Sequence, residues 1–539
     1  MASTEGSIKQ AADLAIKAHA AAQVWAEATQ ADVDRVTQAM ADAGHEAAAH
    51  LAEMAHAETG YGRVDHKTFK NIFCTRRYLD QIRHIPTVGV IASYPERGVT
   101  EIAEPVGVVA GLVPVTNPTS TTLFYGIACV RSRNAVVNAA HPRAVKTIAE
   151  TARILDEAAT AAGAPPNLIS AMTEVSLEGT QALMAHYRTD LVLATGSRPM
   201  VLAAYSSGKP TYAVGPGNSP AWVHRSCADL GEAAAGILAS KTFDNGTACA
   251  SEQAVIACTT IADRLREEFT ARGAYFCTDA EQEQLSKLLF PGGPGTTFNV
   301  EVVGQFATRI AEMAGLSVPA GTRALVVRPA GIGRDHALSH ELLCPVLKWY
   351  PVATEDEGLA TATALLKYGG DGHTAAIWAE DSAIIARYSR VPAYRICVNS
   401  PTLFGAMGFT TGFVPSFTLG TGTIGGAISS DNIGPHHLIN RKRVGLVQRS
   451  WREAGIGEDL PAGFRPLATP AAPSATAPPA AAAPSATAHL SLPPLPAAQA
   501  ALMSGAVPAR TAPTAPPRAP APTDIETIVR EAIEEVIAR

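Results

Sequence analysis

The sequence predicts an α/β fold built on parallel sheets, followed by a tail of different composition. Between residues 104 and 400, short apolar runs alternate with helical stretches of ten residues or more. This alternation is typical of parallel strands joined by crossover helices. The 539 residues allow two or three domains. After about residue 460 Pro and Ala dominate, and we expect the packed part of the chain to end there.

The first sixty residues are rich in Ala and predict helices. Large apolar side chains recur over residues 7–58, and we expect two amphipathic helices with a break near Ala43-Gly44. Residues 58–62 (ETGYG) predict a turn, and residues 64–82 predict a further helix.

The first α/β unit begins after Gly89. The predicted elements are an extended apolar run at 104–114, a helix at 121–131, a strand at 135–138, a helix at 142–162, and strands at 168–172 and 190–195. The last strand leads into Thr195-Gly196-Ser197 and a helix, so backbone N–H groups there suit an anion such as a dinucleotide pyrophosphate. An ordinary turn is the alternative, because no G-x-G-x-x-G motif lies nearby.

The second α/β unit, at 228–420, contains the candidate nucleophile Cys249. The loop Lys241–Val255 (KTFDNGTACASEQAV) follows a predicted helix at 229–240 and leads into a buried strand at 253–258. A thiolate attacks carbonyl carbons well and leaves well, so a cysteine beside a strand suits a covalent thioester intermediate. The alternative is that Cys249 is a small buried apolar residue.

Composition excludes several classes of function. The net charge near −6 leaves no basic stripe for nucleic acid. The eight cysteines form no C-x-x-C pair and have no ligand-like spacing to His, so we expect neither structural zinc nor a disulfide framework. Reduced thiols indicate the cytoplasm. We expect no signal peptide, and no apolar run reaches the ~18–20 residues that span a bilayer.

Several separated motifs together resemble the aldehyde dehydrogenase superfamily, in particular its CoA-acylating branch. These motifs are EPVGVVAGLVPVTNPTS (104–120), LATGSRPMVLAAYSSGKP (193–210), GPGNSP (215–220), FDNGTACASEQ (243–253), ELLCPV (341–346) and GHT (372–374). The resemblance covers roughly residues 10–450. It implies a Rossmann-like NAD-binding domain at 1–230, with a β segment near 95–115 that contributes to oligomerisation. A catalytic domain at 231–425 and an oligomerisation segment at 426–460 would follow, in a homodimer or homotetramer.

The resemblance also implies roles for single residues. Cys249 would attack a short aldehyde, Asn117 and the Cys249 backbone N–H would stabilise the oxyanion, and His373 could help to deprotonate the CoA thiol. The residues implied in cofactor binding are Thr195, Gly196, Ser197, Glu341, Pro114, His141 and Arg143, with NAD as cofactor and CoA as co-substrate. A turn-capping Asn117, a solvated Glu341 and a structural His373 are the alternatives.

One departure from the superfamily favours the acylating branch. Hydrolytic members carry a glutamate base in E-L-G-G-K-S, whereas the matching stretch here begins with Val214. Valine cannot take a proton from water, so the thioester would wait for CoA. The competing hypotheses are a hydrolytic aldehyde dehydrogenase that forms a free acid, and a catalytically degenerate structural cargo or assembly factor.

The tail divides into a linker and a terminal helix. Residues 461–522 are rich in Pro and Ala and predict a disordered tether. Residues 523–539 start with a capping box, Thr523 with Glu526. One apolar face then contains Ile525, Ile528, Val529, Ala532, Ile533, Val536 and Ile537. This helix resembles the encapsulation peptides of bacterial microcompartment enzymes. The resemblance implies shell or cargo proteins as partners and the microcompartment lumen as location; packing on its own domain is the alternative.

Overall fold

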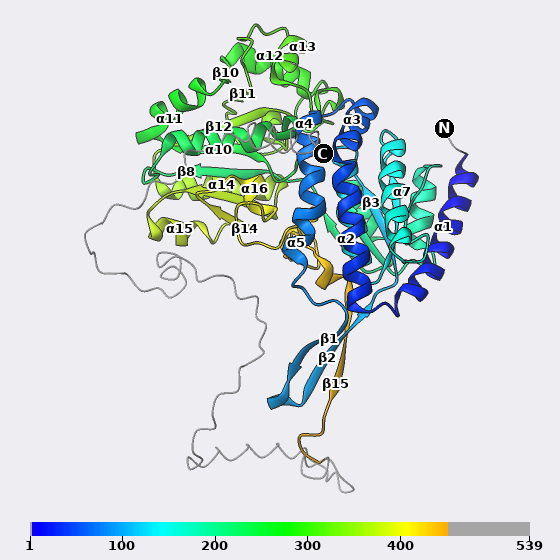
Figure 1. Ribbon diagram of the computed structural model, residues 1–539. Helices are drawn as coiled ribbons and strands as arrows, with labels where there is room; N and C mark the ends of the chain where they lie inside the picture. The colour runs from blue at the N-terminus through cyan, green and yellow to red at the C-terminus, as the bar shows by residue number, and fades with distance from the viewer. Residues whose placement is uncertain (1–2, 451–539) are drawn as a thin grey trace, which may run out of the picture.

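The computed structural model describes residues 3–450, which form two α/β lobes and a projecting arm (Figure 1). Each lobe contains a parallel sheet with helices on its faces. The linker at 461–522, the terminal helix at 523–539 and the last ten residues of the 426–460 segment lie outside the described residues. No helix between residues 3 and 450 has the length and apolar character needed to cross a membrane.

The first sheet has five parallel strands in the order β5-β4-β3-β6-β7. They are β3 (Val108–Val113), β4 (Ala135–Ala140), β5 (Ile169–Ala171), β6 (Leu191–Thr195) and β7 (Thr211–Val214). The connecting helices are α6 (Pro118–Arg131), α7 (Val145–Ala161), α8 (Leu177–Ala185) and α9 (Arg198–Tyr205). β3 and β4 are buried along their whole length, because helices cover both faces, and this explains why every residue in them except Asn138 is apolar or glycine. The prediction of a parallel α/β unit is confirmed.

The second sheet has seven parallel strands in the order β10-β11-β12-β9-β8-β13-β14. They are β8 (Ser219–Val223), β9 (Glu252–Cys258), β10 (Ala274–Phe276), β11 (Ala324–Val327), β12 (Val346–Val352), β13 (Gly372–Trp378) and β14 (Ala393–Val398). Its helices are α10 (Leu230–Thr242), α11 (Thr259–Ala271), α12 (Asp279–Leu289), α13 (Ala307–Met313), α14 (Glu355–Gly369), α15 (Ser382–Tyr388) and α16 (Thr402–Ala406). The chain changes sheets between β7 and β8, before the boundary expected at residue 230.

The N-terminal region contains three helices, so the expectation of two helices with a break near Ala43-Gly44 is wrong. They are α1 (Thr4–Trp25), α2 (Gln30–Glu46) and α3 (Ala48–Thr59). A capping box at Thr29 starts α2, and Gly44 lies inside it. A Cβ at Gly44 would lie 2.9 Å from both Leu123 Cδ2 and Thr75 Cγ2. This glycine therefore allows helices to approach closely rather than ending one.

The predicted helix at 64–82 is confirmed, with a distortion in the middle. It consists of α4 (Val64–Ile72), the π-helical turn η1 (Phe73–Arg77) and α5 (Tyr78–Ile82). Inside η1, Thr75 leaves helical dihedral angles. Such single-turn π segments are frequent at functional sites. α4 and η1 line the cavity described below.

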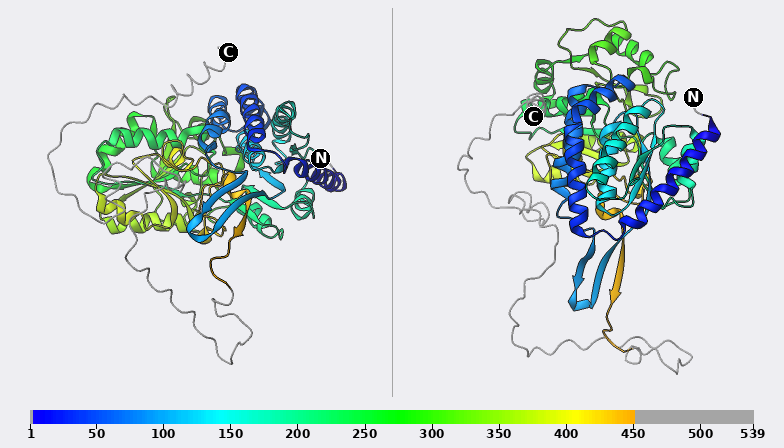
Figure 2. Two further views of the ribbon diagram at one scale, coloured as in Figure 1. Left: turned by 60° about the horizontal axis from the view of Figure 1, so that its bottom comes forward. Right: turned by 45° about the vertical axis from the view of Figure 1, so that its right-hand side comes forward.

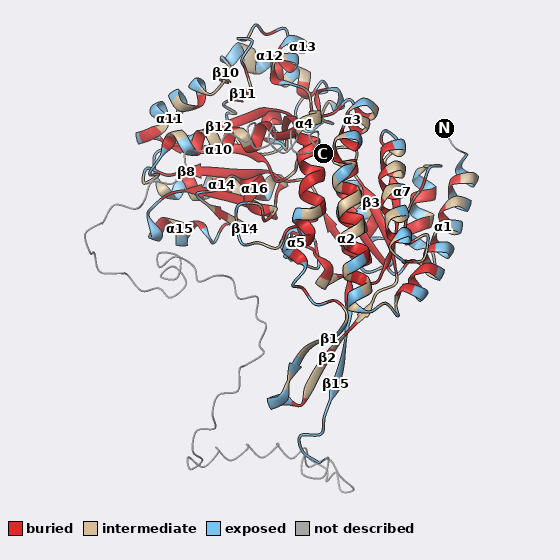
Figure 3. Cartoon of the chain, in the orientation of Figure 1, coloured by how far each residue is buried: buried red, intermediate tan, exposed pale blue. Residues whose placement is uncertain are grey.

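The arm is a three-stranded antiparallel sheet in the order β1-β2-β15. Its strands are β1 (Gly89–Tyr94), β2 (Val99–Pro105) and β15 (Ile439–Gly445). The expected apolar run at 104–114 is therefore shared between β2 in the arm and β3 in the first sheet. Figures 1 and 2 show the arm extending away from the lobes, and Figure 3 shows that few of its residues are buried.

The two lobes meet in an apolar cluster that draws on both. It includes Phe69 from α4, Val214 from β7, and Phe243, Leu403 and Phe404 from the second lobe. Figure 3 shows the central strands of both sheets as continuously buried. The fold thereby brings the ends of elements far apart in sequence to one place, beside Cys249.

Candidate active site

Cys249 lies in a tight loop between the short 3-10 turn η3 (Phe243–Gly246) and β9. Asp244, Asn245 and Gly246 have φ angles of 49°, 54° and 75°. Two consecutive non-glycine residues in this region cost of order 1–3 kcal/mol each, and such strain is typical of functional sites. The predicted buried strand after Cys249 is confirmed, because all of β9 is buried. Buried side chains before Cys249, those of Phe243, Asp244 and Asn245, pack this loop into the protein.

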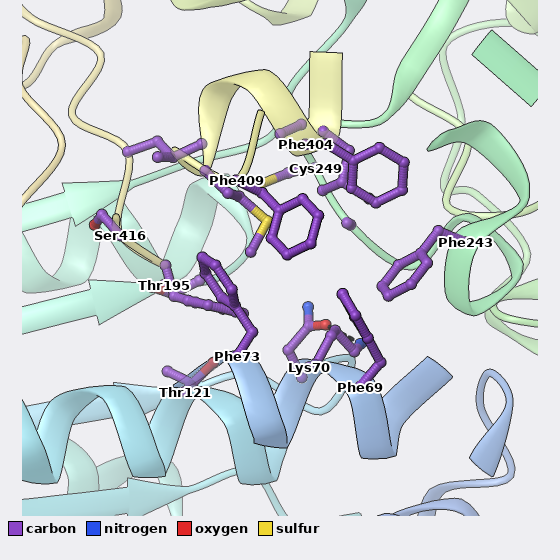
Figure 4. Close-up of a pocket in the computed structure, with 17 residues that line it drawn as sticks. Phe69, Lys70, Phe73, Thr121, Thr195, Phe243, Cys249, Phe404, Phe409 and Ser416 are labelled. Carbon is purple, nitrogen blue, oxygen red and sulfur yellow. Dashed lines mark hydrogen bonds between the residues drawn. The ribbon is translucent and has the colours of Figure 1, made fainter. Parts of the chain in front are cut away.

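The thiol of Cys249 opens into an apolar cavity between the lobes (Figure 4). Its volume of about 60 Å³ is enough for roughly four to six water-sized groups. Six aromatic rings line it: Phe69, Phe73, Phe243, Phe404, Phe409 and Phe417. Polar groups also reach it, from Lys70, Asn117, Thr121, Thr195 and Ser416. Among the described residues that line the cavity, none is acidic and none is a histidine.

Asn117 lies on this cavity, after the carboxyl end of β3. It occupies the N-cap position of α6, yet its side chain makes no capping hydrogen bond there within the described chain, contrary to the turn-capping alternative. Its Nδ2 donates to Thr116 Oγ1 at 3.1 Å and to the Thr247 carbonyl at 3.4 Å. Its Oδ1 accepts from Lys70 Nζ at 2.6 Å. The amide group therefore reaches the loop that carries Cys249.

A buried ionic cluster behind Asn117 was not predicted from the sequence. Asp244 Oδ2 accepts from Lys67 Nζ at 3.0 Å and from Lys70 Nζ at 2.5 Å. Burial alone would raise the pKa of Asp244, but the two lysine charges hold it below its usual range. The spacing of Lys67 and Lys70 on one helical face was the available signal, but a lysine pair is ordinarily a solvated surface feature.

Glu341 is partly buried, which contradicts the alternative hypothesis that it is a solvated surface residue. Its Oε1 accepts from the backbone N–H of Gly217 at 2.9 Å, and burial raises its pKa to about 7. Gly217 passes close to Cys249, because a Cβ there would lie 2.2 Å from the Cys249 carbonyl oxygen. Burial first, and the negative Glu341 second, raise the pKa of Cys249 to about 12. The thiol is therefore protonated at neutral pH.

His373, at the start of β13, is fully buried behind this loop and does not line the cavity. Its Nδ1 lies 3.0 Å from Thr374 Oγ1, and its Nε2 has no hydrogen-bond partner among residues 3–450. Burial, and then the charge of Arg395, lower its pKa to about 3, so the imidazole is neutral. A Cβ on Gly217 would lie 3.4 Å from His373 Cδ2, so this glycine packs closely against the imidazole as well as against the Cys249 backbone.

Val214 ends β7 opposite Thr195 and is buried in the apolar cluster between the lobes. The position where a hydrolytic enzyme of the superfamily would have its carboxylate is therefore apolar. The following Asn218 is also buried, and its amide donates to the carbonyls of Ser339 and Leu365. Neither side chain is placed to activate water.

Several of the predicted cofactor residues lie at one edge of the first sheet, whereas Glu341 belongs to the second lobe. Pro114, His141 and Thr195 follow or end the neighbouring parallel strands β3, β4 and β6, whose carboxyl ends share that edge. Thr195 Oγ1 lies 2.9 Å from Tyr125 Oη. Gly196 N donates to the Val214 carbonyl at 3.3 Å.

Ser197 and Arg143, two further predicted cofactor residues, differ in whether their side chains already form hydrogen bonds. Ser197 is the N-cap of α9 but forms no side-chain cap within the described structure. Arg143 donates to Tyr61 Oη at 3.1 Å and to the Thr59 carbonyl at 3.3 Å. Its guanidinium group is thus held by the turn after α3, while His141 Nδ1 accepts from its backbone N–H.

Sequence comparison places the chain among known proteins. The chain matches the model of the aldehyde dehydrogenase family over residues 1–285. The aldehyde-alcohol dehydrogenase of Clostridium acetobutylicum is 41% identical over 422 residues, which are 77% of this chain and 48% of that protein. The chain thus spans about half the length of such curated relatives. The succinate-semialdehyde dehydrogenase (acetylating) of Clostridium kluyveri is 35% identical over 83% of this chain and 97% of that protein.

Solved structures show the same fold at similar coverage. An acetylating aldehyde dehydrogenase from Geobacillus thermoglucosidasius has a TM-score of 0.81 and 43% identity, covering 83% of this chain and 98% of that one. A propionaldehyde dehydrogenase from a Clostridium phytofermentans microcompartment has a TM-score of 0.73 and 27% identity, covering 80% and 96%. The Rhodopseudomonas palustris propionaldehyde dehydrogenase, solved with bound CoA and an acylated cysteine, has a TM-score of 0.72 and 25% identity. The match covers 83% of this chain and 97% of that one. This chain therefore belongs to the aldehyde dehydrogenase family.

Proposed function

We propose that this protein is a CoA-acylating, NAD(P)-dependent aldehyde dehydrogenase. It converts a short aldehyde, NAD(P)⁺ and CoA into acyl-CoA and NAD(P)H, through a thioester on Cys249. The observation that carries this proposal is the apolar surrounding of Val214, together with a described cavity lining that contains no acidic group. With no base for water, the thioester persists until a thiol arrives.

The chain's own residues supply the nucleophile and the oxyanion site. After the thiol proton of Cys249 has passed to solvent, the sulfur attacks the aldehyde carbon, forming the C–S bond and placing the electron pair of the C=O bond on oxygen. Asn117 Nδ2 and the Cys249 backbone N–H would donate to this oxygen, and each such donor is worth about 3 kcal/mol in acyl transfer. The hydrogen bond from Nδ2 to Thr247 is long at 3.4 Å, so this hydrogen is the one available to the oxyanion.

Bound NAD(P)⁺ supplies the hydride acceptor that turns the thiohemiacetal into a thioester. The residues at the edge of the first sheet and Glu341 fit such a group, because Ser197 begins α9 without a side-chain cap and Glu341 turns toward the Cys249 loop. Thr195, Gly196 and Ser197 would hold the pyrophosphate, Glu341 the nicotinamide ribose, and Pro114, His141 and Arg143 the surrounding wall. The CoA thiolate then attacks the thioester carbon and Cys249 leaves.

His373 has a smaller part in this proposal. Its neutral imidazole is able to accept a proton, and its Nε2 is unpartnered within the described structure. Its imidazole lies next to Gly217, which also approaches the Cys249 loop, and is outside the described lining of the cavity. For His373 to deprotonate the CoA thiol, the loop that carries Cys249 would have to shift when CoA binds.

The substrate is proposed to be short and uncharged. The cavity offers about 60 Å³ among aromatic rings. Lys70 is the cation among the described lining residues, and Asp244 already pairs with it. A carboxylate on the substrate would lose its hydration without gaining a free partner.

Assembly and location follow from the arm and the tail. We infer that the arm forms a subunit contact, because Val444, Leu446 and Val447 are exposed apolar residues in or just after β15. A homodimer or homotetramer would cover them. We also infer that residues 523–539 dock on microcompartment shell or cargo proteins; the apolar face of this segment and the microcompartment origin of one structural relative support this location.

The test measures NADH formation from short aldehydes, with and without CoA, for the wild type and Cys249→Ala. Strict CoA dependence that the variant abolishes is the expected result. Equal rates without CoA, with free acid as product, would overturn the acylating assignment. An active Cys249→Ala variant would overturn the covalent mechanism.

A further inference from the structure

Three consecutive layers connect the buried ionic cluster to the cavity. Asp244 lies at the back, where it accepts hydrogen bonds from Lys67, Lys70, the backbone N–H of Arg63 and Thr247 Oγ1. The Lys70 ammonium forms the next layer and reaches Asn117 Oδ1 at 2.6 Å. The Asn117 amide is the last layer and borders the cavity (Figure 4 shows Lys70 across it from Cys249).

The chemistry of lysine fixes which way the asparagine amide points. An ammonium group has three donors and no acceptor, so its partner on Asn117 must be the carbonyl oxygen Oδ1. The amino group Nδ2 is consequently turned to the Cys249 loop, as its contact with the Thr247 carbonyl shows. With the amide reversed, a carbonyl oxygen would face the developing oxyanion and repel it.

The cluster also holds a net positive charge directly behind this amide. Within it, Arg63, Lys67 and Lys70 are opposed by Asp65 and Asp244, which leaves a formal charge of one positive unit. Burial lowers the pKa of Lys70 to about 8 despite the opposing Asp244, so the ammonium form still dominates at neutral pH. His66 adds no charge, because burial, and then Arg63, lower its pKa to about 4.

We propose that Lys70 is a positioning residue for the oxyanion site: its ammonium orients the Asn117 amide and strengthens Nδ2 as a donor. A donor whose carbonyl end is bound to a cation becomes a better donor at its N–H end, because hydrogen bonds in series polarise one another. This proposal rests on the assignment of Asn117 as an oxyanion donor in the proposed function. Lys70 acts through Asn117, so its effect cannot exceed that of Asn117.

A double-mutant cycle on the full-length protein tests this directly. The variants are Lys70→Met, Asn117→Ala and the double variant, and the matched control is Lys67→Met. Lys67→Met also removes a positive charge that pairs with Asp244. The Nζ of Lys67, however, contacts the Thr116 carbonyl rather than the Asn117 side chain. Steady-state NADH formation with propionaldehyde and CoA gives kcat and KM for each.

Lys70→Met is expected to lower kcat about 10- to 50-fold with KM changed less than threefold, and Lys67→Met to lower kcat less than fivefold. In the Asn117→Ala background, Lys70→Met is expected to change kcat less than twofold. The proposal would be overturned if the kcat losses of Lys70→Met and Asn117→Ala multiplied in the double variant. It would also be overturned if Lys70→Met and Lys67→Met lowered kcat equally. A normal Asn117→Ala variant would instead remove the oxyanion assignment on which it rests.

Folding of the variants is followed by thermal unfolding, because each removes a buried charge. Lys70→Gln covers the case in which Lys70→Met does not fold. It keeps an N–H donor of similar reach for Asn117 Oδ1 without the charge, and its expected loss in kcat is smaller than that of Lys70→Met but absent in the Asn117→Ala background. Loss in that background as well would show a structural role and refute the proposal.

Discussion

The thiol of Cys249 should react slowly in the absence of cofactor, and Glu341 should be one of the reasons. Burial and Glu341 raise the pKa of Cys249 to about 12. At pH 8.5 the thiolate fraction is then ~0.03%, against about one half for a free cysteine, which predicts alkylation slower by a factor on the order of 1,000. Glu341→Gln keeps the shape and the hydrogen bond from Gly217 but removes the charge.

The sign of the Glu341 effect follows from its own titration. Because burial raises the pKa of Glu341 to about 7, the wild type carries the charge above that pH and not below. A like charge nearby disfavours the thiolate, so Glu341→Gln is expected to speed alkylation by about 3- to 10-fold at pH 8.5. Below pH 6 the variant and the wild type should differ little.

The assay measures the rate of Cys249 carbamidomethylation by iodoacetamide, followed by peptide mass spectrometry between pH 5.5 and 9. Glu252→Gln is the matched control, because Glu252 is also a buried carboxyl whose pKa burial raises to about 7. Its Oε1 accepts from the Thr402 backbone N–H, whereas the charge of Glu341 is, after burial, the largest cause of the raised pKa of Cys249. A Glu341→Gln rate at pH 8.5 equal to or below that of the wild type would refute the reasoning.

Two further predictions concern the cavity and the packing of α2. Propionaldehyde is expected to have a kcat/KM at least ~100-fold above that of succinate semialdehyde, because the carboxylate of succinate semialdehyde would be buried without a free partner. Steady-state kinetics with both aldehydes measure this ratio, and comparable kcat/KM values would contradict the prediction. Gly44→Leu is expected to lower the free energy of unfolding by about 1–3 kcal/mol, because a Cβ there already meets Leu123 and Thr75. Denaturant unfolding checks this against Ala31→Leu on the exposed face of α2, and equal stabilities would contradict it.

Much of the fold was predictable because buried parallel strands have a strong local pattern. β4 and β9 are buried throughout and mostly apolar, and their flanking helices are long enough to be recognised. The N-terminal helices were divided wrongly because a glycine in a helix can mark an end or a close approach. Only the tertiary contacts of Gly44 distinguish the two.

That Cys249 lies in a loop before a buried strand was also predictable, since its motif and the motifs around it are long. The chemical surroundings of Cys249 could not be predicted from the sequence. The buried state of Glu341, the packing of His373 against Gly217 and the commitment of Arg143 to Tyr61 all depend on contacts between residues far apart in the chain. A local pattern gives a residue type at a position, but burial and partners decide its protonation state and what it is free to bind.

The lysines of α4 show why this matters for function. Taken alone, charged residues three apart on a helix predict a solvated face. Here Asp244, 174 residues after Lys70, supplies the charge that allows them to be buried, and it does so from the same strained turn that precedes Cys249. One turn therefore positions both Cys249 and, through Lys70, the asparagine expected to stabilise the oxyanion. The strain in Asp244 and Asn245 is consistent with this double role, because a relaxed turn would not hold both groups at the same cavity.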